Sequence, residues 1–231
     1  MVAVVWVALG VGGATVLGTL VGFFFRNYIV KHSNTVNAFA SGLMLVAAMS
    51  GLILPSRDDC GVLLCSIGIL CGVLCLIVCD RFAERKGSGE SASFLLFIAI
   101  AVHNLPEGMA AGVGFGTSQY DLAMTTAVEI AIQNIPEGMV IVGPMLADGI
   151  SVPKTLILAL STALVEIVGA MIGYYLVGIA YAILPFTLAL AGGMMLYVLM
   201  AEMIPGAVQK RREALVCVIG FLCMLFFDSI L

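Results

Sequence analysis

Long apolar stretches occupy most of this chain and restrict its fold more than any other feature. Hydrophobic residues make up 62% of its 231 residues, charged residues make up 10%, and the mean hydropathy is +1.17. These values exclude an ordinary soluble domain and are typical of membrane proteins. A helix needs roughly twenty apolar residues to cross a bilayer. Stretches of about that length occur at residues 2–25, 35–55, 60–80, 93–117, 122–146, 155–178, 184–206 and 214–231.

This pattern predicts an all-α, polytopic membrane protein with eight transmembrane helices in one transmembrane domain, residues 1–231. The sixth and seventh stretches are separated only by an apolar turn, but together they are too long for one crossing and fit two. The longest polar segment, residues 81–93, has the Gly-Ser-Gly composition of a linker. We expect the first stretch to be a retained span, because no basic residue precedes it and it exceeds the apolar core of a signal peptide.

The basic residues predict the orientation. The even-numbered connections between the stretches contain Arg57 alone. Loops rich in Lys and Arg stay on the cytoplasmic side of a membrane. We therefore expect the odd-numbered connections to be cytoplasmic and both termini to be external. The other nine of the ten Lys and Arg residues lie in odd-numbered connections: Arg26, Lys31, Arg81, Arg85, Lys86, Lys154, Lys210, Arg211 and Arg212.

Two further features are interpreted as structural. The basic cluster at residues 210–212 lies at a helix end and anchors the topology, so no nucleic-acid partner is expected for this chain of net charge −4. Cys71, Cys75 and Cys79 fall on one helix face. A free cysteine behaves as a small apolar residue, so this triplet indicates packing rather than metal ligation.

A short polar motif occurs twice inside the apolar stretches. The fourth stretch contains His103–Met109 (HNLPEGM), and the fifth contains Gln133–Met139 (QNIPEGM). An ionisable residue in the hydrocarbon region costs roughly 2.5–3.5 kcal/mol on insertion scales, so a functional site is the default interpretation. Each proline also frees a backbone carbonyl one turn earlier, which a membrane tolerates only where protein, water or an ion satisfies it.

Helical spacing brings the polar side chains of each stretch together. Residues four apart share a face, so His103 and Glu107 point together on the fourth helix. Glu129, Gln133 and Glu137 line one face of the fifth. The two helices follow each other through a short turn and are antiparallel. Two similar motifs then face each other across a local two-fold axis, as in the inverted-repeat bundles of transporters.

The facing carboxylates need a compensating positive charge. Glu107 and Glu137 repel each other unless they are protonated or bridged by a cation. Asn104 and Asn134 lie about 100° round their helices and can reach a neighbouring position. Taken singly, each residue has a structural explanation: a buried His is commonly a hydrogen-bonded core residue, and Asn or Gln commonly forms hydrogen bonds between helices. Taken together, and with no intramembrane Lys or Arg, these residues predict an external divalent metal ion.

The paired motif resembles the signature of the ZIP (Zrt/Irt-like) divalent-metal transporters, in particular their prokaryotic-type GufA-like branch. The number of spans, the external termini and the chain length are also similar to the family. This resemblance implies a binuclear metal site in which Glu107 and Glu137 bridge two ions. The implied ligands of the first ion are His103, Glu107, Gln133 and Glu137, and those of the second are Asn104, Glu107, Asn134, Glu137 and Glu166.

Three other acidic residues, Glu166, Glu202 and Glu129, are candidates for separate roles in metal binding or transport. Glu166 matches the acidic residue that the family places in the sixth span. Glu202 resembles an acid near the cytoplasmic exit, although Ala201 stands where some relatives have histidine. The connection at residues 81–93 also lacks the histidines that many relatives have there. From its own position toward the external half of the fifth span, Glu129 is either an entry carboxylate or a helix-packing residue.

We therefore expect a transporter rather than an enzyme, which moves a divalent transition metal toward the cytoplasm. Imidazole, carboxylate and amide ligands suit Zn²⁺ and also Fe²⁺, Mn²⁺ or Cd²⁺. Zn²⁺ leads on family grounds as the transported substrate, and no organic cofactor is expected. The resemblance further implies a homodimer, an elevator-like movement and a multi-pass location in the plasma membrane. The alternatives are an intramembrane metalloenzyme, for which no His-Glu-x-x-His motif is present, and a metal sensor without flux.

Overall fold

All regular structure in the described part of the chain is helical. The computed structural model describes residues 2–86, 101, 104–105, 107–116, 120–147, 149–179 and 183–230. No strand occurs within these ranges. The expected all-α class is thus confirmed for them. Within the predicted fourth span, residues 93–117, positions 93–100, 102–103, 106 and 117 lie outside the described residues.

The helices differ in length and regularity. Two of them, η1 and η4, are π-helices, and η2 is a short 3₁₀ turn. Residues 107–113 form a helical segment that precedes η2. The elements are α1 (Val2–Phe24), α2 (Arg26–Lys31), α3 (Ser33–Ala47), η1 (Ala48–Ile53), α4 (Leu54–Lys86), η2 (Gly114–Gly116), α6 (Tyr120–Ala147), α7 (Val152–Ile179), α8 (Leu184–Val198), η4 (Leu199–Met203), α9 (Ile204–Ala207) and α10 (Arg211–Ile230).

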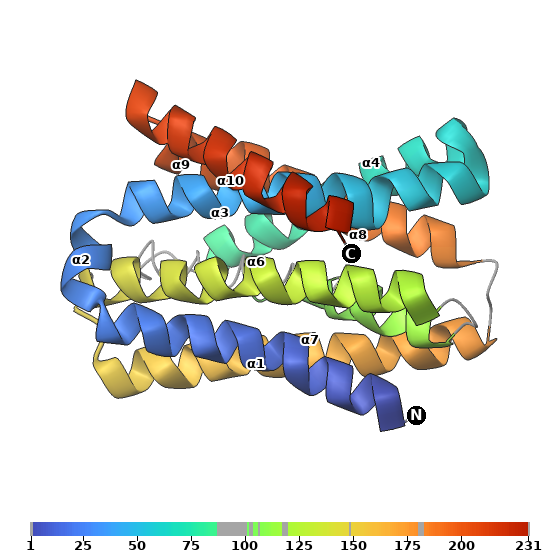
Figure 1. Cartoon of the computed structure of the whole chain (residues 1–231), viewed down its shortest axis with the longest axis horizontal. Helices are drawn as coiled ribbons and strands as arrows, with labels where there is room; N and C mark the ends of the chain where they lie inside the picture. Colours follow the sequence, from blue (N-terminus) through green and yellow to red (C-terminus); the bar gives the residue numbers. More distant parts are fainter. Residues whose placement is uncertain are drawn as a thin grey trace.

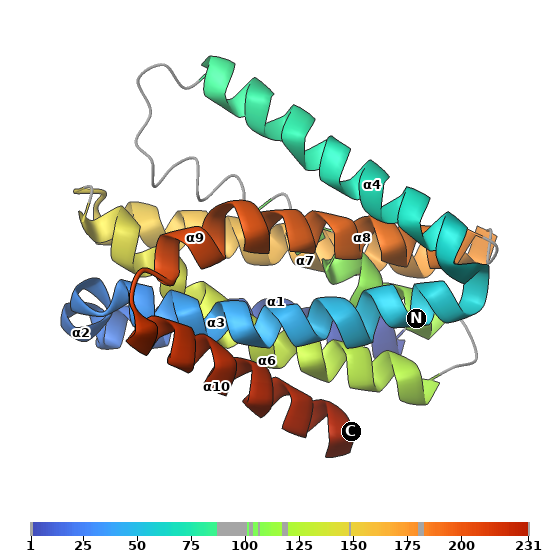
Figure 2. The same ribbon diagram turned by 90° about the horizontal axis from the view of Figure 1, so that it is seen from above.

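The long helices form two groups that lie against each other (Figures 1 and 2). In the first group α1 packs against α6 and α7, and the segment 107–113 packs against α7. We call this group the inner bundle. In the second group α4 packs against α8, and α10 packs against α3; we call it the outer bundle. The two bundles meet mainly where α3 lies along α6.

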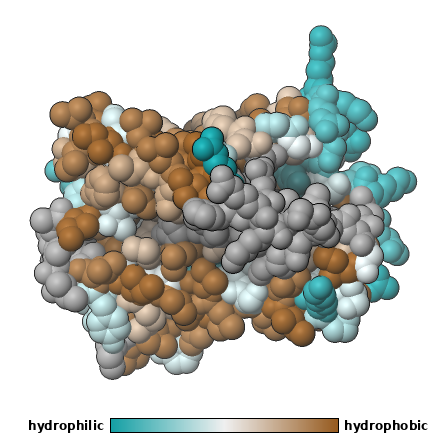
Figure 3. All heavy atoms as spheres, turned by 180° about the vertical axis from the view of Figure 1, so that it is seen from behind, coloured by the Kyte–Doolittle hydropathy of each residue, from teal (hydrophilic) through white to brown (hydrophobic). Residues whose placement is uncertain are grey.

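The outer surface is that of a membrane protein. Within the described ranges, five helical stretches are long and apolar enough to cross a bilayer: Val2–Phe24, Ser33–Val78, Val152–Leu176, Leu184–Ala207 and Arg211–Ile230. Large apolar side chains such as Trp6, Leu63, Leu164 and Phe226 are at least 60% exposed. Apolar atoms cover much of the visible face (Figure 3). Such an extended apolar surface requires lipid around it. The full count of eight spans stays a prediction.

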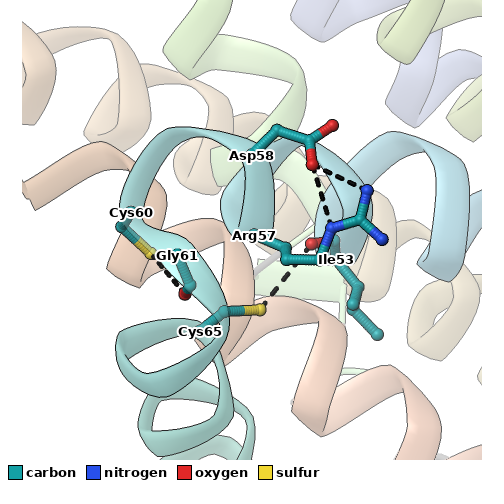
Figure 4. A network of polar contacts seen from close by, with 6 residues as sticks. All are labelled: Ile53, Arg57, Asp58, Cys60, Gly61 and Cys65. Carbon is teal, nitrogen blue, oxygen red and sulfur yellow. Dashed lines mark hydrogen bonds and ion pairs between the residues drawn. The ribbon is translucent and has the colours of Figure 1, made fainter.

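The stretch Ser33–Val78 is 46 residues long and reverses direction within itself. Gly61 breaks the helix with φ 79° and ψ 163°, a backbone conformation that favours glycine. The Cys65 thiol donates to the carbonyl of Ile53 across this turn, with an S–O distance of 3.7 Å (Figure 4). After the turn, α4 runs back and away from α3 (Figure 2). The stretch therefore supplies two antiparallel arms, each long enough for one crossing.

Both π-helices stand immediately before an X-Pro pair. The N–H of Leu54 donates to the carbonyl of Met49, and the N–H of Ile204 donates to that of Leu199, five residues earlier in each case. The residue that follows each donor is a proline. A proline ring clashes with the preceding turn of an α-helix. The wider π turn relieves this clash at matching places in α3 and α8, and such turns often mark functional segments.

The two ends of the molecule differ in charge. The basic residues Arg26, Lys31 and Lys154 lie at the end where α2 is found, together with the start of α10, whereas Arg57 lies near the turn at the opposite end. Hydrophilic residues gather at the α2 end (Figure 3). Both termini point toward the other end (Figure 1). This asymmetry is the basis of the predicted orientation.

Labelling from outside tests that orientation. In a cysteine-free background, Asp59→Cys and Lys86→Cys place a thiol near opposite ends of α4. We expect an impermeant maleimide added to intact cells to label Asp59→Cys and to label Lys86→Cys only after permeabilisation. The reverse labelling pattern would invert the predicted orientation.

Candidate metal centre

Six of the seven predicted ligands are buried in the inner bundle. Each has at most 1% of its surface exposed. They come from three segments: Asn104 and Glu107 from the fourth span, Gln133, Asn134 and Glu137 from α6, and Glu166 from α7. The seventh, His103, lies outside the described residues, as does Pro106.

Hydrogen bonds between side chains connect these segments. The amide of Gln133 donates through Nε2 to Glu107 Oε1 at 2.8 Å. The amide of Asn134 donates through Nδ2 to Glu166 Oε1. The hydroxyl of Thr15, on α1, donates to Glu166 Oε2 at 3.1 Å. The structure therefore joins the two copies of the motif to α7 and α1 in one buried polar cluster.

The described part of the cluster carries several acidic groups and neither a Lys nor an Arg. Glu137 and Glu166 both lie close enough to Glu107 to repel its carboxylate electrostatically. No Lys or Arg whose side chain the structure describes is buried. Buried charges of one sign are strongly unfavourable unless an opposite charge or protons compensate them. A bound divalent cation would provide that compensation.

Three oxygen atoms of the cluster are available as ligands. Glu107 Oε2, Gln133 Oε1 and Asn134 Oδ1 are buried, and none has a hydrogen-bond partner in the part of the chain that the structure describes. Leaving such an atom unsatisfied costs about 1–3 kcal/mol. Carboxylate and amide oxygens are suitable ligands for divalent ions. The donor set therefore fits a metal ion.

Amide oxygens are needed in this donor set. Among the described residues, no group of three or more His, Cys, Asp or Glu side chains is placed to hold a metal ion. Thiols do not contribute either. The six cysteines whose side chains are described are free and lie on α4 and α10, away from the cluster. The ligands available are therefore the carboxylates together with the amides of Gln133 and Asn134.

The glycine after each motif glutamate brings two helices into backbone contact. A Cβ atom at Gly108 would lie 2.0 Å from the carbonyl oxygen of Glu166, and one at Gly138 would lie 2.2 Å from that of Thr15. Small residues allow this close approach in membrane bundles. Gly108 thus places α7 beside Glu107, and Gly138 places α1 beside Glu137.

Thr15 is a member of the cluster that the sequence analysis did not identify. It is fully buried and bonded to Glu166. Thr19, one turn later, donates to the carbonyl of Gly138 at 3.3 Å. A signal was present in the sequence, because Thr15 and Thr19 are polar residues spaced four apart within the first apolar stretch.

Glu129 and Glu202 are not part of this cluster. The Glu129 side chain is buried on α6, and Asp228 of α10 lies close enough to interact electrostatically with its carboxyl group. Its Oε2 also lies 3.1 Å from the position that a Cβ would take at Gly51, in η1. Glu129 therefore connects the two bundles. Glu202 lies in η4, and its side chain is outside the described part of the structure.

A small cavity lies between the bundles near Glu129. Its volume is about 40 Å³, enough for a water molecule or an ion. Its lining includes Asp59 near the Gly61 turn, Gly51 and Thr126 beside Glu129, and Ala110, one turn beyond Glu107. Its lining residues thus come from both bundles.

The fold and the cluster define a helical membrane protein with a candidate cation site among its helices. A family model described as ZIP Zinc transporter matches residues 82–228. The chain belongs to this family. The family consists of transporters, so the expectation that the chain is not an enzyme is confirmed.

Individual relatives support the same assignment. Zinc transporter GufA of Myxococcus xanthus is 41% identical over 149 residues, which are 63% of this chain and 59% of that protein. Zinc transporter ZIPB of Bordetella bronchiseptica is 31% identical over 241 residues, with 94% of this chain and 78% of that protein covered. Human zinc transporter ZIP11 is 35% identical over 157 residues, with 64% and 46% covered. The chain thus spans less than two thirds of the Myxococcus and human proteins, and the resemblance inferred from the paired motif is confirmed.

Replacing a contact glycine tests how the centre is assembled. We expect Gly138→Ala to lower the melting temperature of the purified protein strongly, because overpacking typically costs about 1–3 kcal/mol and here the obstacle is rigid backbone. Gly13→Ala is the matched control, since no atom lies within 4 Å of its added Cβ. Equal melting temperatures for the two variants would show that the helices do not depend on this contact.

Proposed function

We propose that this chain transports divalent transition-metal ions, zinc foremost, toward the cytoplasm through a binuclear site in the inner bundle. One observation carries the proposal. Glu107, Glu137 and Glu166 are buried together with amide groups between membrane helices, with no buried Lys or Arg among the described side chains. A site of this kind attracts a cation and repels an anion.

The two metal positions follow from how the side chains are shared. In the proposal Glu107 and Glu137 bridge the ions. Gln133 donates to one oxygen of Glu107, and Glu137 and Glu166 both interact electrostatically with its carboxylate. His103 and Gln133 would complete one position. Asn104, Asn134 and Glu166 would complete the other, and the bond between Asn134 and Glu166 supports their assignment to a common ion.

The ligand chemistry supports zinc without excluding related ions. Carboxylate and amide oxygens with one imidazole nitrogen suit Zn²⁺, Fe²⁺, Mn²⁺ and Cd²⁺, and the cluster includes no thiolate among its described residues. The relatives whose names state a metal are zinc transporters. Partly amide ligation is also weak enough for release, which a conducting site requires.

Access from the external side would use the cavity between the bundles. Asp59 lines it near the Gly61 turn, and Gly51 and Thr126 line it beside Glu129. Glu129 would then act as an entry carboxylate together with Asp228. Glu202 would be an acidic residue near the cytoplasmic exit of the transport path.

Release toward the cytoplasm would require movement between the bundles. The inner bundle contains the six proposed ligands that the structure describes and is joined to the outer bundle mainly through α3 and α6. Sliding of the inner bundle would carry the ions without dismantling their ligands. We further propose that the protein works as a homodimer in the plasma membrane.

Zinc uptake separates transport from metal sensing without flux. Vesicles containing the wild-type protein should accumulate radioactive zinc, whereas Glu107→Ala and Glu137→Ala should lose uptake because each removes a ligand from both ions. Asp58→Ala serves as control, since it removes an exposed carboxylate paired only with Arg57, and surface pairs contribute about 0–1 kcal/mol. Zinc binding without uptake by the wild type would identify a sensor, and normal uptake by either glutamate variant would refute the bridging role.

Single-position ligands should behave differently from bridging ones. We expect Glu166→Gln to reduce bound zinc from about two ions per chain to about one, because in the proposed binuclear site Glu166 is a ligand of one ion only. His103→Asp should shift competition uptake from zinc toward manganese, because it exchanges a nitrogen ligand for oxygen. Metal analysis of the purified proteins and competition uptake measure these effects. Loss of both ions in both variants would contradict the two-position assignment.

A further inference from the structure

A second pocket lies far from the metal cluster, at the end of the molecule where α2 joins α1 to α3. It is open, has a volume of about 450 Å³, and is lined by Arg26, Asn27, Lys31, Leu146 and Val152. The first three belong to the α2 turn, and the other two belong to the adjoining ends of α6 and α7. No acidic residue is among these lining residues.

The two basic side chains have no protein partner in the described structure. Arg26 and Lys31 form neither a salt bridge nor a side-chain hydrogen bond with another described residue. Both are exposed. A guanidinium and an ammonium in one pocket offer several hydrogen-bond donors to an anion, and the guanidinium matches the geometry of phosphate oxygens.

The surroundings of the pocket indicate a lipid rather than a soluble anion. Phe24, Phe25 and Tyr28 flank the basic residues in sequence and are 84%, 52% and 57% exposed. Exposed aromatic rings beside Lys and Arg at the end of a membrane helix are typical of the interface between hydrocarbon and headgroups. Leu146 and Val152 add an apolar wall to the pocket. The pocket therefore combines basic and apolar side chains, as a phospholipid requires.

The pocket also has a firm base. Ile29, in the middle of α2, is 1% exposed, and its Cγ2 atom lies 3.5 Å from where a Cβ would stand at Gly143 of α6. This contact holds α2 against α6. Arg26 and Lys31 lie on either side of Ile29 in sequence, so both are carried by an anchored turn rather than by a loose loop.

We propose that this pocket binds the phosphate of an anionic phospholipid through Arg26 and Lys31, with part of the acyl region against Leu146 and Val152. Basic pockets between transmembrane helices bind anionic headgroups in this way. A bound lipid would connect α2, the link between the two bundles, to the corner of α6 and α7. The proposal requires that the chain lies in a membrane and does not depend on metal transport.

Native mass spectrometry of the whole purified chain tests this site, with phosphatidylglycerol and phosphatidylcholine of identical acyl chains as probes. We expect tighter binding of phosphatidylglycerol by the wild type and a roughly 30-fold loss in Arg26→Gln/Lys31→Gln, at about a factor of five per basic residue. Lys210→Gln/Arg211→Gln is the matched control, because it removes the same charge at the same end of the molecule and should change affinity less than about threefold.

Two further arms identify the ligand and verify the fold. Arg26→Lys/Lys31→Arg keeps the charges and should keep the binding, which excludes misfolding as the cause of a loss. Inorganic phosphate at the same concentration should not displace the phospholipid. Equal losses in the two Gln variants, no preference for phosphatidylglycerol, or displacement by inorganic phosphate would each overturn the proposal.

Discussion

The structure depends on a cluster of carboxylates buried among its helices. In the part of the chain that the structure describes, no Lys or Arg side chain is buried with them. Glu107, Glu137 and Glu166 lie together, and the amides and hydroxyl around them satisfy only some of their oxygens. Burial of like charges in a membrane is costly, so the surrounding helices must hold these groups firmly. This cost is consistent with the proposed metal site, because the repulsion between the carboxylates would favour binding of a divalent cation.

Backbone contact supplies the rigidity. Gly108 and Gly138 let the helices of the inner bundle approach until a methyl group would not fit. Without a hydrophobic drive between helices in lipid, close packing and hydrogen bonds provide most of their association. The same glycines follow the glutamates directly in sequence, so the residue that binds and the residue that positions it are neighbours. The outer bundle is less regular, since η1 and η4 widen two of its helices before prolines.

The sequence predicted the helical class, the family and most of the cluster, because polar residues within long apolar stretches have few alternatives to a shared site. Glu166 needed the family resemblance, since its own spacing linked it to nothing. Thr15 was missed because a threonine in a helix commonly bonds its own preceding turn, and only packing shows that it reaches Glu166. Glu129 and Asp228 lie close together although they are far apart in the chain, and no local pattern predicts such proximity.

X-ray absorption at the zinc edge of the zinc-loaded protein tests the central claim most directly. The proposed centre should give a first shell of oxygen and nitrogen at about 2.0–2.2 Å, with no sulfur at about 2.3 Å. Bridging carboxylates should also give a second zinc at about 3.5–4 Å. Zinc–sulfur scattering, or a single isolated zinc in a fully loaded sample, would contradict a binuclear site built from Glu107, Glu137 and their neighbours.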